Sequence, residues 1–191
     1  MKHTVVALVE DRPGVLNRVA SLFRRRGFNI ESLAVGTTEE TGVSRMTIVL
    51  DGAEGIVEQV EKQLYKLVDV IRVADLTSAE AVVRELALVK IACPTEQRAE
   101  LLDLIGIFRA HVVDVGPTHL VAELSAEADR MDAFLENIRP YGVLEMVRTG
   151  RVGMIRGAAT TAIHESEPED VERFHMESGR LPEGELPFVS D

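Results

Sequence analysis

The sequence predicts an α+β fold in which one order of elements, strand, helix, strand, strand, helix and strand, occurs twice. Short apolar runs of strand length alternate with segments whose apolar residues recur every three or four positions, as they do on one face of a helix. This order restarts after residue 80, and the chain from residue 157 onward is acidic instead of periodically apolar. At 191 residues and 46% hydrophobic content, the chain is long enough for two small domains that each bury a core.

The first unit is predicted to span residues 4–78. It opens with a continuous apolar run, after which apolar residues recur at helical spacing until Gly27 ends the helix. Two further strands, a second helix and a last strand complete the unit. The predicted elements are, in order, the strand Val5–Val9, the helix Val15–Arg26, the strands Asn29–Val35 and Ser44–Leu50, the helix Ala53–Leu67 and the strand Val70–Leu76.

The second unit is predicted to span residues 80–156 and repeats the same order. Its two middle strands pair back through the turn residues Gly116-Pro117. Its helices carry their apolar residues on one face. The predicted elements are the strand Glu85–Ala92, the helix Glu96–Phe108, the strands His111–Val115 and Thr118–Leu124, the helix Ala126–Ile138 and the strand Val143–Val152.

Each unit therefore has the βαββαβ order of the ferredoxin-like arrangement, in which two helices cover one face of a four-stranded sheet. The other face and the edge strands need covering, because unpaired edges promote association. A symmetric dimer that pairs edges or packs faces is the commonest closed solution. We therefore predict two ferredoxin-like domains in a homodimer.

The segment 157–191 has a different character from the two units. Nine acidic residues in it stand against only Arg173 and Arg180. Its apolar residues are scattered and show no period. Such a composition favours disorder, so we predict a disordered acidic tail, with a short docked helix as the alternative.

The overall charge excludes several classes of partner. A net charge of −11 argues against a nucleic-acid interface, because such an interface must neutralise phosphates. No apolar run approaches the ~20 residues that a membrane-spanning helix requires, and no signal segment opens the chain. We therefore expect a cytoplasmic protein that binds neither nucleic acid nor a membrane.

The sequence shows no plausible catalytic machinery. Cys93 is the only cysteine, and its place after an apolar strand favours a buried thiol over a nucleophile. The five histidines lack the close spacing of metal ligands. Acylphosphatase shares the βαββαβ topology and is the enzymatic alternative, but Asp11 stands here where a phosphate cradle requires cations. No metal site and no catalytic residue are expected.

The turn between the first strand and the first helix is the best candidate for a binding site. Gly14 has no Cβ, so a ligand can approach the backbone there, and the amides of the helix N-terminus suit a carboxylate. We expect Asp11 to cap the helix and Pro13 to stand where the helix begins. Asp11 and Asn29 are the nearest candidates for binding a ligand's ammonium. The alternative is that this turn is ordinary capping chemistry with a structural role only.

The motifs around this turn resemble a known family. Asp11-Arg12-Pro13-Gly14-Val15-Leu16, a helix ending in Arg24-Arg25-Arg26-Gly27 and the strand start Phe28–Leu33 together resemble the ACT domain, a small amino-acid-sensing module. With the segments Ser44–Ile48 and Glu61–Val70, the chain resembles the small regulatory subunit of acetohydroxyacid synthase, also called acetolactate synthase. The resemblance covers nearly all of residues 1–156.

The resemblance implies where an effector binds. In that family the effector lies between two ACT domains of a dimer, and the matching positions here are Asp11, Gly14 and Asn29. The backbone of Gly14 and Val15, preceded by Pro13, would hold the carboxylate. Asn29 and Ile30 of the neighbouring chain would close the site, and the side chains of Val15 and Ile30 would line its pocket. Family members often carry Asn at the position of Asp11.

The resemblance also implies a function. The chain is expected to be a non-catalytic regulatory subunit that binds a branched-chain amino acid, with valine preferred, and that activates a catalytic large subunit and confers feedback inhibition. Thiamine diphosphate, FAD and Mg are expected in that partner, and no cofactor is expected in this chain. The alternative is a stand-alone ACT sensor or transcription regulator, for which a DNA-binding helix pair would be expected; the sequence shows none.

Overall fold

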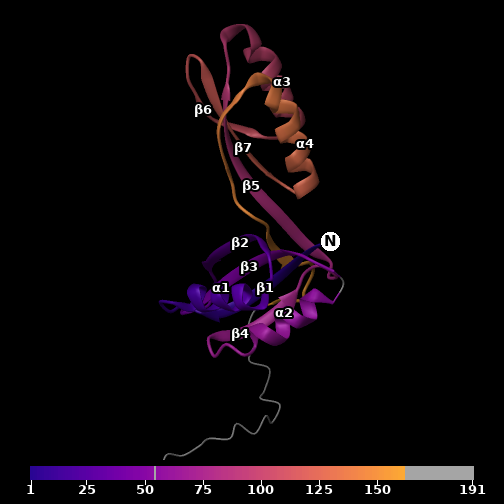
Figure 1. The fold of residues 1–191 in the computed structure, drawn as a ribbon. Helices are drawn as coiled ribbons and strands as arrows, with labels where there is room; N and C mark the ends of the chain where they lie inside the picture. Colours follow the sequence, from indigo (N-terminus) through magenta and orange to yellow (C-terminus); the bar gives the residue numbers. More distant parts are fainter. Residues whose placement is uncertain (54, 162–191) are drawn as a thin grey trace, which may run out of the picture.

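The computed structural model describes residues 1–53 and 55–161, so most of the predicted acidic tail lies outside the described residues. Two antiparallel sheets succeed one another along the chain, and each carries its two helices on one face (Figure 1). The strand orders are β2-β3-β1-β4 in the first sheet and β6-β7-β5-β8 in the second. Because both orders correspond to one ferredoxin-like topology, the predicted fold class is confirmed.

The first unit contains all six predicted elements. They are β1 (Lys2–Glu10), α1 (Val15–Arg26), β2 (Ile30–Thr37), β3 (Val43–Asp51), α2 (Ile56–Leu64) and β4 (Val70–Asp75). Helix α2 is shorter than expected at both ends. Gly55 has φ 88°, a left-handed conformation that no helix continues through, and beyond Leu64 the backbone makes tighter bonds, such as Leu67 N–H to Leu64 O at 2.9 Å.

The first core lies between the helices and one face of the sheet. Alternate residues of each strand point to it, as the period of two requires. Val5, Ala7 and Val9 of β1 meet Val19 and Phe23 of α1 there. Along the sheet, β2 and β4 are the two edge strands.

The second unit follows the same plan. Its elements are β5 (Ala81–Ala92), the 3₁₀ turn Thr95–Gln97, α3 (Arg98–Ile107), β6 (His111–Val115), β7 (His119–Ala126), α4 (Ala128–Ile138), the 3₁₀ turn Arg139–Tyr141, and β8 (Val143–Arg148). Helix α3 begins two residues later than predicted, because the chain after Pro94 first makes a 3₁₀ turn.

The predicted last strand Val143–Val152 is wrong as a single element. The structure divides this region into β8 and a separate β9 (Val152–Ile155), and both pair with β5. Strand β8 pairs with the second half of β5, whereas β9 pairs with its first four residues, Ala81–Arg84. Gly150 lies at the break, and a Cβ there would be 2.5 Å from the side chain of Ser32, so only glycine fits.

After the break between β8 and β9, the chain returns to the first sheet. Residues beyond it cover the face of that sheet that carries no helices, where Val6 and Leu8 are buried. Gly153 packs against Leu76 there, and a Cβ added to this glycine would lie only 3.1 Å from the Leu76 side chain. The chain itself therefore covers part of the face that we expected to need a partner.

Candidate functional site

The turn before α1 has a specific backbone geometry. Gly14 has φ 88° and ψ −8°, the values of the third residue of a type II β-turn, and Pro13 occupies the second position, where proline is favoured. The Val15 N–H donates to Arg12 O at 3.3 Å and closes the turn. Helix α1 starts immediately afterwards, so the next two amides, those of Leu16 and Asn17, lack intrahelical acceptors. This arrangement suits an anion.

Asp11 does not cap the helix, contrary to our expectation. The N-cap residue is Gly14, and no side chain caps it. Asp11 lies three residues earlier, where its backbone N–H donates to Gly42 O at 2.8 Å. Pro13 likewise belongs to the turn and not to the start of the helix. The side chain of Asp11 is exposed and forms no ion pair within the described residues, so it is free to bind a cation.

A second turn of the same geometry precedes α2. Gly55 has φ 88° and ψ −5°, and the Ile56 N–H donates to Ala53 O at 3.3 Å. The turn by itself is therefore a device for starting a helix in this fold, which supports the structural alternative. Any binding function of the Gly14 turn must depend on what surrounds it.

The strand register separates the predicted site residues into two groups. Ile30 pairs with Leu50, which pairs with His3 near the start of β1. Asp11 follows the opposite end of β1, where Glu10 pairs with Val43. At about 3.3 Å per residue, the two ends of the sheet are on the order of 20 Å apart. Asp11, Pro13, Gly14 and Val15 therefore lie at one end, and Asn29 and Ile30 at the other.

Burial further limits the roles of the predicted residues. Asp11, Pro13, Gly14 and Asn29 are exposed, and Ile30 is half-buried against the core. The side chain of Val15 belongs to the core, so it does not line a surface pocket in this chain. Its backbone N–H is also engaged, because it donates to Arg12 O.

The six predicted residues line none of the five most distinct cavities along the described residues. Two of them, of 390 and 410 Å³, share Arg45 of β3. Sequence reasoning missed this residue. The signal was a single charge within the apolar run of β3, placed on the face opposite Met46 and Ile48.

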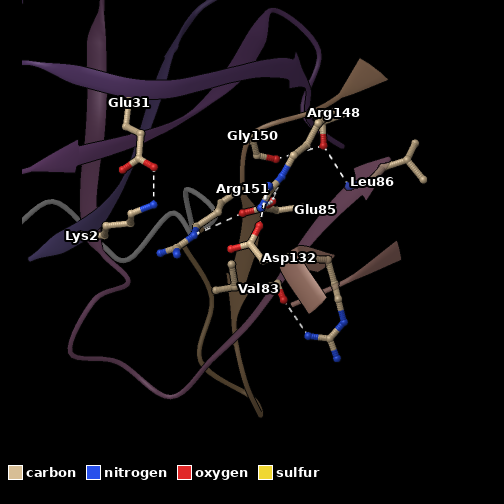
Figure 2. A network of polar contacts seen from close by, with 11 residues as sticks. Lys2, Glu31, Val83, Glu85, Leu86, Asp132, Arg148, Gly150 and Arg151 are labelled. Atoms are coloured by element: carbon tan, nitrogen blue, oxygen red, sulfur yellow. Dashed lines mark hydrogen bonds and ion pairs between the residues drawn. The ribbon is translucent and has the colours of Figure 1, made fainter. Parts of the chain in front are cut away.

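A third cavity, of 530 Å³, lies between the two units beside a network of charged side chains. Figure 2 shows Arg148 and Arg151 converging on the carboxylate of Glu85, with Asp132 on the far side of Arg148. The Arg148 Nη1 lies 2.7 Å from Asp132 Oδ1. Burial acts to lower the pKa of Arg148, but its hydrogen bonds to Asp132 and Glu85 outweigh this and raise the pKa. The network consists of matched charges, which indicates a structural role.

The described residues contain no cluster of candidate metal ligands. Within residues 1–53 and 55–161, no group of three or more His, Cys, Asp and Glu side chains is placed to hold a metal ion. Cys93 is buried, as expected. In the same part of the chain, none of the helices combines the length and apolarity needed to cross a membrane.

Two family models match the chain, each over one of its two units. The model described as an AHAS small subunit-like ACT domain matches residues 6–72. The model described as the small subunit of acetolactate synthase matches residues 84–157. The second match includes β9, so the return of the chain to the first sheet lies within the region that this family shares.

Curated relatives and a solved structure agree with these models. A probable acetolactate synthase small subunit of Archaeoglobus fulgidus is 52% identical over 82% of this chain and 98% of its own length. The acetolactate synthase small subunit of Mycobacterium bovis is 45% identical over 81% of this chain and 92% of its own. The crystal structure of the acetolactate synthase small subunit from Thermotoga maritima superposes with a TM-score of 0.77 at 39% identity, covering 83% of this chain and 99% of that one. The chain therefore belongs to the family of acetolactate synthase small subunits.

Proposed function

We propose that this small subunit binds a branched-chain amino acid, with valine preferred, in a site formed between two copies of the chain, and that it thereby regulates its catalytic subunit. The observation that carries the proposal is the separation of the site residues. Gly14 and Asn29 lie at opposite ends of the first sheet, so one chain cannot bring them to one ligand.

An edge strand between the two groups supports a dimer. Strand β2 has one unpaired side, and its exposed backbone groups suit pairing with a second copy. If two β2 strands pair antiparallel about an axis between Leu33 and Ala34, Ile30 of the second copy lies opposite Thr37 of the first. Thr37 pairs with Ser44 at the same end of the sheet as Gly14. The dimer therefore unites Gly14 of one copy with Asn29 and Ile30 of the other.

Apolar exposure along this edge agrees with such pairing. Val35 of β2 and Leu16 of α1 expose 48% and 46% of their surface. A neighbouring copy would remove both from water, which is favourable by about 25 cal/mol per Å² of apolar surface.

The groups at this interface match an amino acid. The amides at the start of α1 suit its carboxylate, and the exposed Asp11 together with Asn29 suits its ammonium. Ile30 offers an aliphatic contact. This chain would supply the effector site, and the catalytic subunit would hold thiamine diphosphate, FAD and Mg. Both subunits would be cytoplasmic. Binding to that subunit would activate it, and valine would inhibit the assembly.

Mixed dimers test the shared site. In homodimers, Gly14→Leu should abolish valine binding at the interface site, and Asn29→Ala should weaken it roughly 10- to 100-fold. When both variants are mixed, one of the two sites in each mixed dimer combines the intact Gly14 of one chain with the intact Asn29 of the other. Calorimetry on the mixture should then recover interface binding of valine at a maximum of one interface site per mixed dimer. If mixing recovers nothing although mass measurement shows mixed dimers, the site is not shared between chains.

The regulatory part has a separate test. The tagged chain should co-purify from its own cells with a large subunit in stoichiometric amount, and valine should inhibit the synthase activity of the reconstituted pair. Isolation of the chain without such a partner would favour the stand-alone sensor.

A further inference from the structure

Arg45 occupies an unusual position in the first sheet. It pairs in register with Leu8 of β1 and Gly36 of β2, and it points to the face that carries no helices. Strand β9 and the residues that follow it cover that face. The Arg45 Nη2 donates to Gly153 O, and Nη1 donates to Thr161 Oγ1, both at 2.5 Å.

The charge of Arg45 lacks a direct counter-ion in the described part of the chain. Both acceptors are neutral, and no carboxylate of residues 1–53 and 55–161 forms an ion pair with it. Burial lowers the pKa of Arg45, and the charge of Glu39 offsets this only in part. A guanidinium has five N–H donors, so three remain beyond these two bonds. A half-buried cation with spare donors favours an anionic ligand, above all a carboxylate.

The space beside Arg45 has the size and lining of a small-molecule site. The 390 Å³ cavity lies between the β2–β3 connection and the segment 153–161, and pockets for small ligands begin at about 300 Å³. Its walls combine apolar and charged groups. Leu8, Val43 and Ile155 provide an aliphatic wall, and the exposed carboxylates of Glu39 and Glu40 stand at its rim.

We propose that this cavity is a second binding site, for a small aliphatic amino acid whose carboxylate pairs with Arg45. The ammonium group faces Glu39 and Glu40, and the short side chain packs against Leu8, Val43 and Ile155. This site lies within one chain, so it does not require the dimer. It is distinct from the proposed interface site, because neither Gly14 nor Asn29 lines the cavity. An occupied site would tie β3 to the segment 153–161 and would connect the first unit to the second.

The test uses the full chain with the interface site removed. In the Gly14→Leu background, calorimetry with L-valine and L-leucine should still show one site per chain. Adding Arg45→Gln should weaken that binding at least tenfold, whereas Arg25→Gln, an exposed charge at the end of α1, should not change it. Isobutylamine, which lacks the carboxylate, should not bind.

A second variant addresses the case that Arg45→Gln fails to fold. Met154 lines the cavity and is 63% exposed, so a larger side chain is tolerated there. The chain contains no tryptophan, so one introduced at this position would be the only one. In the Gly14→Leu background, the tryptophan fluorescence of the Met154→Trp variant should change on titration with L-valine or L-leucine and should reach saturation.

Several outcomes would overturn the proposal. The first is that Gly14→Leu binds no amino acid and that the fluorescence of Met154→Trp does not change. This outcome would contradict the second site without contradicting the interface site. Another is equal binding with and without Arg45. Displacement of the amino acid by acetate at equal concentration would identify a general anion site and would contradict the assignment to amino acids.

Discussion

The carboxylate of Glu85 accepts a hydrogen bond at Oε2 from Arg148 Nε at 2.6 Å, and Arg148 Nη2 lies 2.5 Å from the same oxygen as an ion pair. The pair lies where β5 leaves β9 and enters the second sheet (Figure 2). The side chain of Glu85 is only 7% exposed, and Arg151 Nε lies 3.5 Å from its other oxygen. One buried carboxylate therefore holds the strand on each side of the break between β8 and β9.

Replacing Glu85 by Gln should destabilise the protein substantially. The substitution leaves two arginines beside a neutral group, and breaking a buried pair costs about 3–5 kcal/mol. We expect about 3 kcal/mol, because Arg148 keeps Asp132. Urea unfolding measures the change. The control is Glu127→Gln, whose partner Arg84 and own side chain are both exposed, with an expected loss below about 1 kcal/mol. Equal losses of unfolding free energy in the two variants would show that the buried ion pair contributes no more to stability than the exposed one.

The two glycine turns provide a matched pair for testing the effector site. Gly14 and Gly55 share φ 88°, so leucine strains both backbones to a similar extent. Only Gly14→Leu should abolish valine binding at the interface site, since only that turn is proposed to hold the carboxylate there. Thermal unfolding should show similar losses of stability for both, and calorimetry should separate them. Unchanged valine affinity in Gly14→Leu would remove this turn from the site.

The sequence predicted most of the fold because its signals are local. Periods of two and of three to four residues place β1, α1, β3 and α4 within a few residues of their observed ends. The break between β8 and β9 had no local signal, since it depends on Gly150 meeting Ser32, which is far away in the sequence.

The candidate site was predictable only in part. The turn was visible in the letters Pro13-Gly14, but the capping role of Asp11 was wrong, because the left-handed Gly14 itself becomes the N-cap. The separation of Gly14 from Asn29 depends on strand register, which needs the sheet order. That the two meet across a dimer was available from the family resemblance alone, and it stays a prediction.

The position at which the tail is cut should decide its effect on stability. Removing residues 165–191 deletes all nine acidic residues of the tail and should leave the unfolding midpoint unchanged. Removing residues 157–191 also deletes the buried Thr161 and its bond to Arg45. A lost hydrogen bond to a charged group costs roughly 1.5–3 kcal/mol, so the midpoint should fall by several degrees. Equal midpoints for the two truncated chains would mean that Thr161 contributes nothing.

Selectivity among effectors should be graded. The proposed aliphatic contact at the interface is Ile30, and one methylene more or less in an apolar pocket is worth only about 1–3 kcal/mol. Valine, isoleucine and leucine should therefore all inhibit the reconstituted synthase, at different concentrations. Inhibition by valine with no effect of the other two at any concentration would require a steric or polar filter that Ile30 does not provide.

Removing a polar or charged partner at the interface site should weaken effector binding more than a change in the size of the ligand does. Asp11→Ala or Asn29→Ala would remove one of the two proposed partners of the ammonium, and losing a hydrogen bond to a charged group corresponds to roughly 10- to 100-fold weaker binding. All three ligands should weaken together. The control is Glu10→Gln: this neighbouring carboxylate already pairs with Arg12 at 3.0 Å, so its loss should leave binding unchanged.

These same variants should still activate the catalytic subunit, because Asp11 and Asn29 are proposed to contact the effector and not the partner. A valine titration of synthase activity with each variant measures both properties at once, as activity without valine and as the concentration for half inhibition. Activation that falls in parallel with inhibition would place Asp11 or Asn29 at the contact with the catalytic subunit. Full inhibition at the ordinary valine concentration would instead place the ammonium elsewhere, and Asp11 would then have no part in effector binding.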